Sequence, residues 1–172
     1  MKKNKWIYQV FLWTFLLSIT FSYITNIISL NSSIIITGII IVIVIAIGII
    51  FDMLGASALT SKEATFHAMA SKKIKGSKQA IKLIRNNVRV SSICNDIVGD
   101  ICGIVSGGLG AVLAIALSNK LHLDLALITM IISAIISALT VGGKAIFKNI
   151  AIKNSDKILF TLSKIMCTFT KN

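Results

Sequence analysis

The sequence contains no proline, and only 6 of its 172 residues are aspartate or glutamate. Without proline, long helices can run uninterrupted. The cysteines Cys94, Cys102 and Cys167 are an odd number and include no C-x-x-C pair, which argues against a disulfide framework or a zinc site and favours reduced packing residues. Charged residues make up 14% of the chain and hydrophobic residues 55%, with a mean hydropathy of +0.88. Those values are typical of an integral membrane protein and exclude an ordinary soluble domain.

Four apolar segments are long enough to cross a bilayer, which takes about 20 residues. They cover residues 6–28, 33–53, 91–117 and 123–141. Isoleucine-rich runs favour strands in water, but a segment in lipid must satisfy its own backbone hydrogen bonds, so we predict helices. The predicted fold class is all-α: a polytopic helical bundle in which residues 1–172 form a single membrane domain and the first helix stays uncleaved.

The basic residues predict the orientation of this bundle. With the N-terminus in the cytoplasm, seventeen of the 18 lysines and arginines fall on the cytoplasmic side, and Lys120 alone falls on the other side. This positive-inside pattern predicts a multi-pass plasma-membrane protein with both termini cytoplasmic and short external loops at residues 29–32 and 118–122. Because topology explains the net charge of +12, nucleic acid is not expected as a partner.

Two cytoplasmic segments are predicted to be helical. Residues 60–90 form a hairpin: Thr60-Ser61-Lys62-Glu63 fits a capping box, and Gly76 separates the two helices. Residues 155–169 (SDKILFTLSKIMCTF) begin at a candidate N-cap, Ser155, and form an amphipathic helix on the membrane surface or on the bundle. A basic face on the hairpin, suited to anionic lipid or a partner protein, comprises Lys72, Lys73, Lys75, Arg85 and Arg89.

The third apolar segment carries two aspartates, Asp96 and Asp100, four residues apart. A charge inside the bilayer costs about 2.5–3.5 kcal/mol on insertion scales and usually marks an ion or substrate path. Asp52 lies near the cytoplasmic end of the second segment, so antiparallel helices place all three carboxylates at similar depth, and Asn95 adds an amide oxygen. Carboxylate and amide oxygens suit Mg²⁺ or Ca²⁺ better than zinc.

Small residues share a helix face with these aspartates and predict close helix packing. Gly99, Gly103 and Gly107 recur every four residues, and the fourth segment offers Ser133 and Ser137 as a matching surface. The aspartates should therefore face a neighbouring helix, within the protomer or in a homodimer, and not lipid.

Other interpretations of the carboxylates stay open. In one, Asp52 is simply an interfacial residue in water. In the others, Asp96 and Asp100 pair with basic residues of the hairpin, or are protonated and hydrogen-bonded to a serine. The candidate partners are Lys82, Arg85, Arg89, Ser57 and Ser92.

Catalysis is not expected. His67 and His122 fall in different compartments, and no Ser/His/Asp or Cys/His set shares one. The glycine-rich run at residues 107–110 follows no strand, which excludes a phosphate loop.

Several short motifs carry a family resemblance. Ser57-Ala58-Leu59-Thr60-Ser61 is similar to a T-A-L-T-S stretch, and residues 76–87 (GSKQAIKLIRNN) to a G-x-x-A-x-x-L-x-x-N-P hairpin. Gly99-Asp100 stands near a G-N pair, and Gly143-Lys144-Ala145 resembles a P-K turn. Together, from about residue 51 to residue 166, the chain resembles the transmembrane domain of the CNNM/CorC magnesium transporters. The family's glutamate falls on Gly55 or Ala56, and Asp52 is its hypothetical replacement.

The resemblance implies a magnesium site. Its ligands would be Asp52, Asn95, Asp96 and Asp100, with Ser57 assisting. Residues 33–166 would be the family-like region and residues 6–28 an extra helix. The chain leaves no room for the CBS pair that binds nucleotide in the family, so regulation would need a separate protein.

We therefore expect an integral membrane protein that binds or transports divalent cations, Mg²⁺ first, and that is not an enzyme. The alternative is a non-transporting membrane interaction protein whose basic face binds anionic lipid or a partner. A holin-like pore former is a third class, which the intramembrane aspartates disfavour. The expected partners are membrane lipid, a second copy in a homodimer and a separate regulatory protein.

Overall fold

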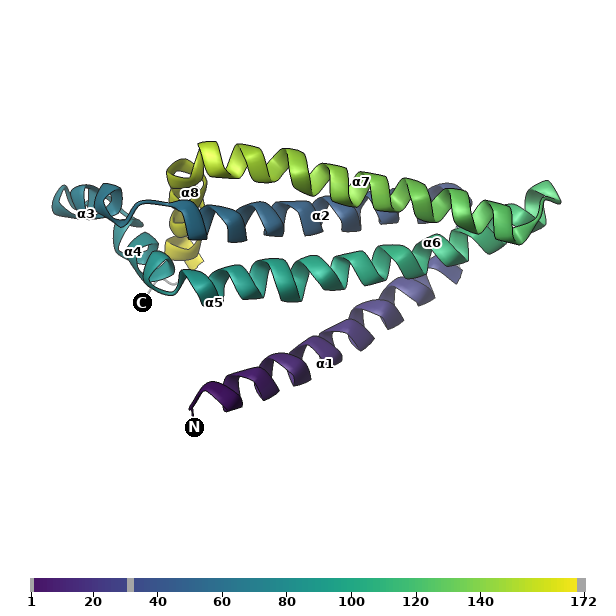
Figure 1. Cartoon of the computed structure of the whole chain (residues 1–172), viewed down its shortest axis with the longest axis horizontal. Coiled ribbons are helices and arrows are strands. Elements are labelled where there is room, and N and C mark those ends of the chain that lie inside the picture. Colours follow the sequence, from purple (N-terminus) through teal and green to yellow (C-terminus); the bar gives the residue numbers. More distant parts are fainter. Residues whose placement is uncertain (1, 31–32, 170–172) are drawn as a thin grey trace. The chain divides into compact units, whose positions relative to one another are not determined.

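The structure, a computed structural model, describes residues 2–30 and 33–169, and the regular elements in these ranges are all helices (Figure 1). The predicted all-α fold class is confirmed. Ser32 and Lys171, which the sequence analysis places in the first external loop and among the cytoplasmic basic residues, lie outside the described residues.

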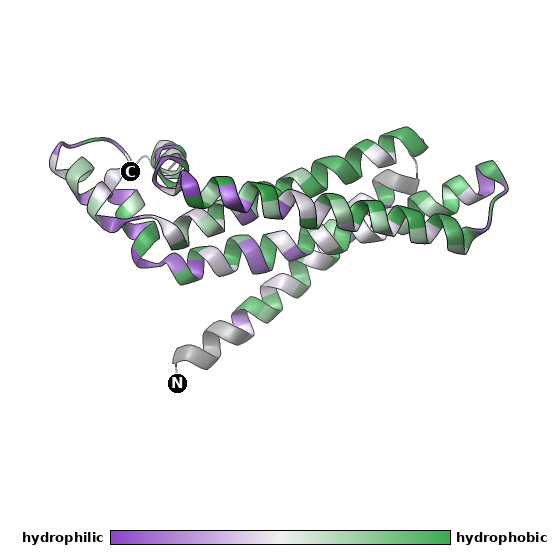
Figure 2. Ribbon diagram, turned by 45° about the horizontal axis from the view of Figure 1, so that its top comes forward, coloured by the Kyte–Doolittle hydropathy of each residue, from purple (hydrophilic) through white to green (hydrophobic). Residues whose placement is uncertain are grey.

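Four long helices are apolar enough to cross a membrane by length and composition. They are α1 (Lys2–Leu30), α2 (Ile34–Thr60), a continuous run from Asn87 to Leu121, and α7 (Leu125–Lys153). The second and fourth were predicted to end at residues 53 and 141 but continue to Thr60 and Lys153. The prediction followed hydropathy, whereas the helices continue beyond the most apolar stretches through less apolar residues such as Gly142 and Lys144. In Figure 2 the hydrophobic colour follows these helices, and the hydrophilic colour gathers at the short helices α3 and α4.

The side chains of the long helices are unusually exposed for apolar residues. In an apolar 18-residue stretch of each helix, the share that is buried inside the chain is 6% for α1, 22% for α2 and 6% for α7. Ile39 and Val42, from the isoleucine-rich run of α2, are 54% and 58% exposed. Water would penalise such a surface, whereas lipid accepts it, which is why these β-branched residues form helices here.

The chain divides into two compact units. The first unit comprises Met1–Gly48 and Ile97–Gly143, and the second comprises Ile49–Asp96 and Lys144–Asn172. Cys94, Cys102 and Cys167 form no disulfide bond with one another in the described part of the chain.

In the first unit, α1 approaches α6 (Asp100–Leu121) obliquely and meets it toward the C-terminal end of α1 (Figure 1). Ser22 and Asn26 of α1 lie with Gly108 of α6 around a hollow of about 170 Å³. Close contact between α6 and α7 occurs at Gly110, where a Cβ atom would overlap the Cδ1 atom of Ile136. A larger residue at position 110 would therefore require the end of the Ile136 side chain to move.

In the second unit, the hairpin helices α3 (Glu63–Ser71) and α4 (Ser77–Arg85) pack with α8 (Ser155–Phe169) around a small apolar core. The fully buried core side chains include Phe66 and Leu159. The amphipathic helix predicted at residues 155–169 thus has the predicted bounds, and it packs on the hairpin. Ser155 is its first residue and not its N-cap, a difference of one position.

Gly76 ends the turn between α3 and α4 as predicted. Its φ is +93°, a conformation that glycine adopts without steric cost. A Cβ atom at this position would also lie 3.3 Å from the Ser163 Oγ atom and 3.3 Å from the Lys164 backbone nitrogen of α8. The glycine therefore serves both the turn and the contact between the hairpin and α8.

The predicted capping box at the start of α3 is wrong. No side chain at the N-cap position, Lys62, bonds to the helix, and α2 itself continues to Thr60. Asp156 of α8 supplies the cap instead: its Oδ1 atom accepts the Lys62 backbone N–H at 3.0 Å, and its Oδ2 atom accepts the Thr65 hydroxyl at 2.9 Å. The Glu63 side chain does not cap the helix and pairs instead with Arg85 and His67.

Candidate functional site

The segment that carries the candidate ligands is a π-helix, η1 (Ser92–Gly99), between α5 (Asn87–Ser91) and α6. In a π-helix each backbone N–H bonds to the carbonyl five residues back, and such turns are frequent at functional sites. The widened turn changes which residues share a face, so the face drawn from ideal α-helical spacing does not hold across residues 92–99. Nothing in hydropathy or propensity signals this change of helix type.

Asn95, in the middle of η1, presses its side chain against Gly55 of α2. Its Nδ2 group donates to the Ser91 hydroxyl at 3.3 Å. Its Oδ1 atom is buried and has no hydrogen-bond partner among the described residues. A Cβ atom at Gly55 would overlap that oxygen and would lie 3.2 Å from the Cβ atom of Cys94. The absence of a side chain at position 55 is therefore what admits the amide of Asn95.

An unpaired buried acceptor is costly, because the oxygen has lost its bonds to water without gaining others. In native proteins such atoms are few, and each one calls for an explanation, such as an ion or a functional role. Among the described residues, the buried side-chain atom without a hydrogen-bond partner is Asn95 Oδ1.

Asp52 and Ser57 lie on α2 on either side of Gly55. Asp52 is half-buried, and it precedes Gly55 by three residues, which puts both on one face of the helix. Ser57 is fully buried, and its hydroxyl donates to the Leu54 carbonyl at 2.8 Å. That hydroxyl oxygen keeps its acceptor lone pairs.

Asp96 and Asp100 are both exposed within the described chain, which differs from the expected placement against a helix of the same protomer and leaves the placement in a homodimer a prediction. None of the ion pairs between described residues includes either of them. Across the described ranges, no three His, Cys, Asp or Glu side chains are grouped so that they could hold a metal ion. The convergence of Asp52, Asp96 and Asp100 that the spacing suggested is therefore not found.

The predicted pairing of small residues within the chain is wrong at most of its positions. A Cβ atom at Gly103 or Gly107 would meet no other atom of the described structure within 4 Å. Ser133 and Ser137 of α7 are exposed, and only Gly99 is buried. A close contact lies instead at Gly110, where the neighbouring side chains of α7 are Ile132 and Ile136.

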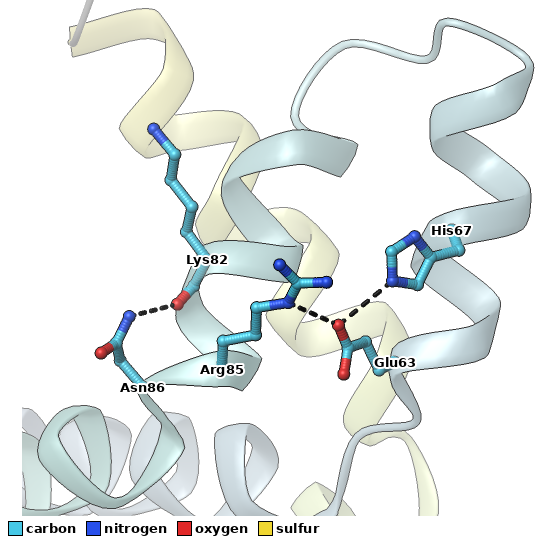
Figure 3. A network of polar contacts seen from close by, with 5 residues as sticks. All are labelled: Glu63, His67, Lys82, Arg85 and Asn86. Atoms are coloured by element: carbon cyan, nitrogen blue, oxygen red, sulfur yellow. Dashed lines mark hydrogen bonds and ion pairs between the residues drawn. The ribbon is translucent and has the colours of Figure 1, made fainter.

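The residues of the predicted basic face do not all share one environment. Lys72, Lys73 and Lys75 are exposed on the turn between α3 and α4. Arg85 instead turns toward α3, and its Nε–H donates to the Glu63 Oε1 atom at 2.7 Å (Figure 3). The proposed pairing of Arg85 with the aspartates is thus replaced by an ion pair inside the hairpin. Arg89 lies on α5 and is exposed.

His67 completes this contact, with its Nε2 atom 3.1 Å from the same Glu63 oxygen (Figure 3). The hydrogen bond from Arg85, and then the one with His67, lower the pKa of the Glu63 carboxyl below its usual value of 4.5. Both bonds favour the charged form. Because the three side chains are well exposed, the group contributes little to stability in water.

Comparison of the chain with known protein families, curated proteins and solved structures finds no match. The likeness to the CNNM/CorC family therefore rests on the short motifs alone.

Proposed function

We propose that this protein binds a divalent cation, Mg²⁺ first, and conducts it across the plasma membrane. The observation that carries the proposal is the buried, unpartnered Oδ1 atom of Asn95, which lies in a π-helical turn beside Asp96. The Asn95 amide and the Asp96 carboxylate, which are adjacent in the sequence, supply oxygen donors of the kind that hard cations prefer.

The surrounding residues support the same proposal. Asp52 shares a helix face with Gly55, which contacts the Asn95 amide, whereas Ser57, two residues after Gly55, lies on a different face of α2. Asp100 begins α6, four residues after Asp96. Carboxylates in a membrane-spanning helix are expensive without a partner, and a bound cation is such a partner.

The lack of a three-carboxylate cluster in the described residues is compatible with Mg²⁺. This ion loses its water reluctantly, so proteins usually hold it through one or two carboxylates and leave several waters in place. A partly hydrated ion needs the Asp96 carboxylate, the Asn95 oxygen and the Asp52 carboxylate of α2, and not a closed cage.

The Gly55 contact also bears on the family resemblance. The resemblance assigns a glutamate to position 55 or 56, and in this chain the amide of Asn95 fills the space that a side chain at position 55 would take. Asn95 is thus a better substitute for the missing oxygen ligand than Asp52 alone. On this proposal the cytoplasm holds both termini, in keeping with the positive-inside pattern. A homodimer and a separate regulatory protein stay predictions.

The test is a flux assay. The full chain is reconstituted in vesicles that contain a Mg²⁺-sensitive dye, and uptake is compared between wild type, Asn95→Leu, Asp96→Asn and Asp100→Asn. We expect Mg²⁺ uptake by wild type and at least a tenfold loss in Asn95→Leu and Asp96→Asn, because each removes a ligand oxygen or its charge.

Asp124→Asn is the matched control. Asp124 Oδ2 accepts the Leu127 backbone N–H at 3.2 Å outside the proposed site, and asparagine preserves that acceptor. Its flux should equal that of wild type. Absence of wild-type flux together with absence of Mg²⁺-dependent thermal stabilisation would overturn the proposal.

A further inference from the structure

Four lysines surround one open groove at the turn between α3 and α4. This groove, of about 540 Å³, is also lined by apolar residues that include Ile74 and Cys167. We call it the lysine groove, and its lysines are Lys73, Lys75, Lys78 and Lys82. All four are exposed, so their ammonium groups remain in contact with the surroundings of the protein.

The positive charge of the lysine groove is not balanced by the nearby carboxylates. No aspartate or glutamate is among the described residues that line it. Glu63 is engaged by Arg85, and Asp156 by the Lys62 N–H and the Thr65 hydroxyl. Gathering like charges raises their mutual repulsion, which an anion in the groove would relieve.

The backbone adds to this positive potential. Gly76 is the N-cap of α4, and no side chain caps the helix there. The first turn of α4 contains no acidic residue. The positive end of the helix dipole therefore lies at the same turn as the lysines, and it favours an anion.

Apolar side chains stand beside the lysines. Ile74 is 38% exposed on the turn, and Ile165 of α8 is 51% exposed. Lys75, Lys164 and Ile165 line an adjoining hollow of about 750 Å³, which shares Cys167 with the lysine groove. Exposed isoleucines bordered by lysines match a membrane interface, where the alkyl part enters the acyl layer and the ammonium stays with the headgroups.

The chain also holds the lysine groove close to a membrane-spanning helix. Lys82 precedes Asn87, where the third spanning run starts, by five residues. At a helical rise of about 1.5 Å per residue this is roughly 8 Å, about one Debye length at physiological salt.

From the charge, the apolar border and this position, we propose that the lysine groove binds the headgroups of anionic phospholipids. This inference does not depend on cation transport. It assigns a lipid site to Lys78 and Lys82, which the sequence analysis did not include in the basic face, and it leaves out Arg85, which is paired with Glu63.

The experiment measures lipid retained by the purified full chain in detergent, with native mass spectrometry, during titration with phosphatidylglycerol or phosphatidylcholine. In the groove variant, glutamine replaces all four lysines of the lysine groove. A control variant loses the same number of charges elsewhere. In it, glutamine replaces three lysines toward the C-terminal end of α7 and one near the start of α8: Lys144, Lys148, Lys153 and Lys157. Circular dichroism checks that both variants keep the helix content of wild type.

We expect wild type to prefer phosphatidylglycerol and the groove variant to bind it at least about tenfold more weakly, because each lysine near an anionic surface contributes to binding. The control variant should stay within threefold of wild type. Equal loss in both variants, or equal retention of both lipids by wild type, would overturn the proposal. So would displacement of phosphatidylglycerol from wild type by inorganic phosphate or polyglutamate at equal charge concentration, since the site would then recognise a soluble anion.

Discussion

The Asp156 carboxylate of α8 accepts the backbone N–H of Lys62, 94 residues earlier, at 3.0 Å. This bond caps α3 from another helix, and the second bond to the Thr65 hydroxyl fixes the carboxylate in place. The C-terminal helix is thereby joined to the hairpin by a directional contact as well as by the apolar core around Phe66 and Leu159.

Replacing Asp156 with alanine should loosen the start of α3. Loss of an N-cap acceptor typically costs about 1 kcal/mol, so we expect faster hydrogen exchange at the first amides of α3 and a lower thermal midpoint in detergent. Asp156→Asn is the control, because its side-chain oxygen still accepts the Lys62 N–H. If Asp156→Ala exchanges as slowly as wild type, the cap does not stabilise the helix.

Gly55→Ala should destabilise the protein, because the added methyl group would overlap the Asn95 amide oxygen. Forced overpacking usually costs about 1–3 kcal/mol. The measurement is the rate at which the buried Cys94 thiol becomes reactive on heating. Gly103→Ala is the matched control, since its methyl group would meet nothing of the described structure within 4 Å and should leave stability unchanged or raise it slightly.

A double variant sharpens this prediction. Asn95→Ala removes the amide that a methyl group at position 55 would strike, so Gly55→Ala/Asn95→Ala should be more stable than the sum of the two single effects predicts. Additive effects would show that the two residues do not touch.

Gly76→Ala should separate the hairpin from α8. Alanine at φ +93° is strained, at a cost of about 1–3 kcal/mol, and its methyl group would crowd the Ser163 hydroxyl at 3.3 Å. We expect faster proteolysis within residues 60–90 and a lower thermal midpoint. Gly142→Ala, with open space around its Cβ position in the described structure, should behave like wild type.

The Glu63 contact predicts a small dependence of stability on acid. The pKa of Glu63 is lowered in the folded state, so its stabilising contribution is fully present above about pH 4.5 and is lost as the pH falls through the lowered value. Wild type should therefore lose more thermal stability than Glu63→Gln when both are compared at pH 6 and pH 3. An equal loss in the two proteins would contradict this sign.

Much of the fold followed from composition and periodicity. Helices form at the four apolar segments because lipid leaves the backbone no other partner, and α8 begins and ends at the predicted residues because its apolar stripe has helical spacing. The hairpin turn at Gly76 could also be predicted from the sequence, because glycine permits the positive φ that the turn requires.

The candidate site was less predictable. The sequence identified Asp52, Asn95, Asp96 and Asp100 as costly polar residues among apolar ones, which depends on residue type alone. It could not show that residues 92–99 form a π-helix or that Asn95 is the side chain with the unpaired buried oxygen. The placement of the Asn95 amide depends on its contact with Gly55 of α2, which local sequence does not specify.

The sequence by itself thus determined the elements of this protein: long helices suited to lipid, a basic hairpin and polar residues in a spanning run. Their identity is local, because hydropathy and helical period depend on neighbours along the chain. Only the tertiary structure decided which contacts form: Asp156 in place of a local capping box, Asn95 against Gly55, and Gly110 in place of Gly103 and Gly107. These contacts join residues tens of positions apart, and the atoms that meet across two helices are set by their packing geometry and not by either sequence alone.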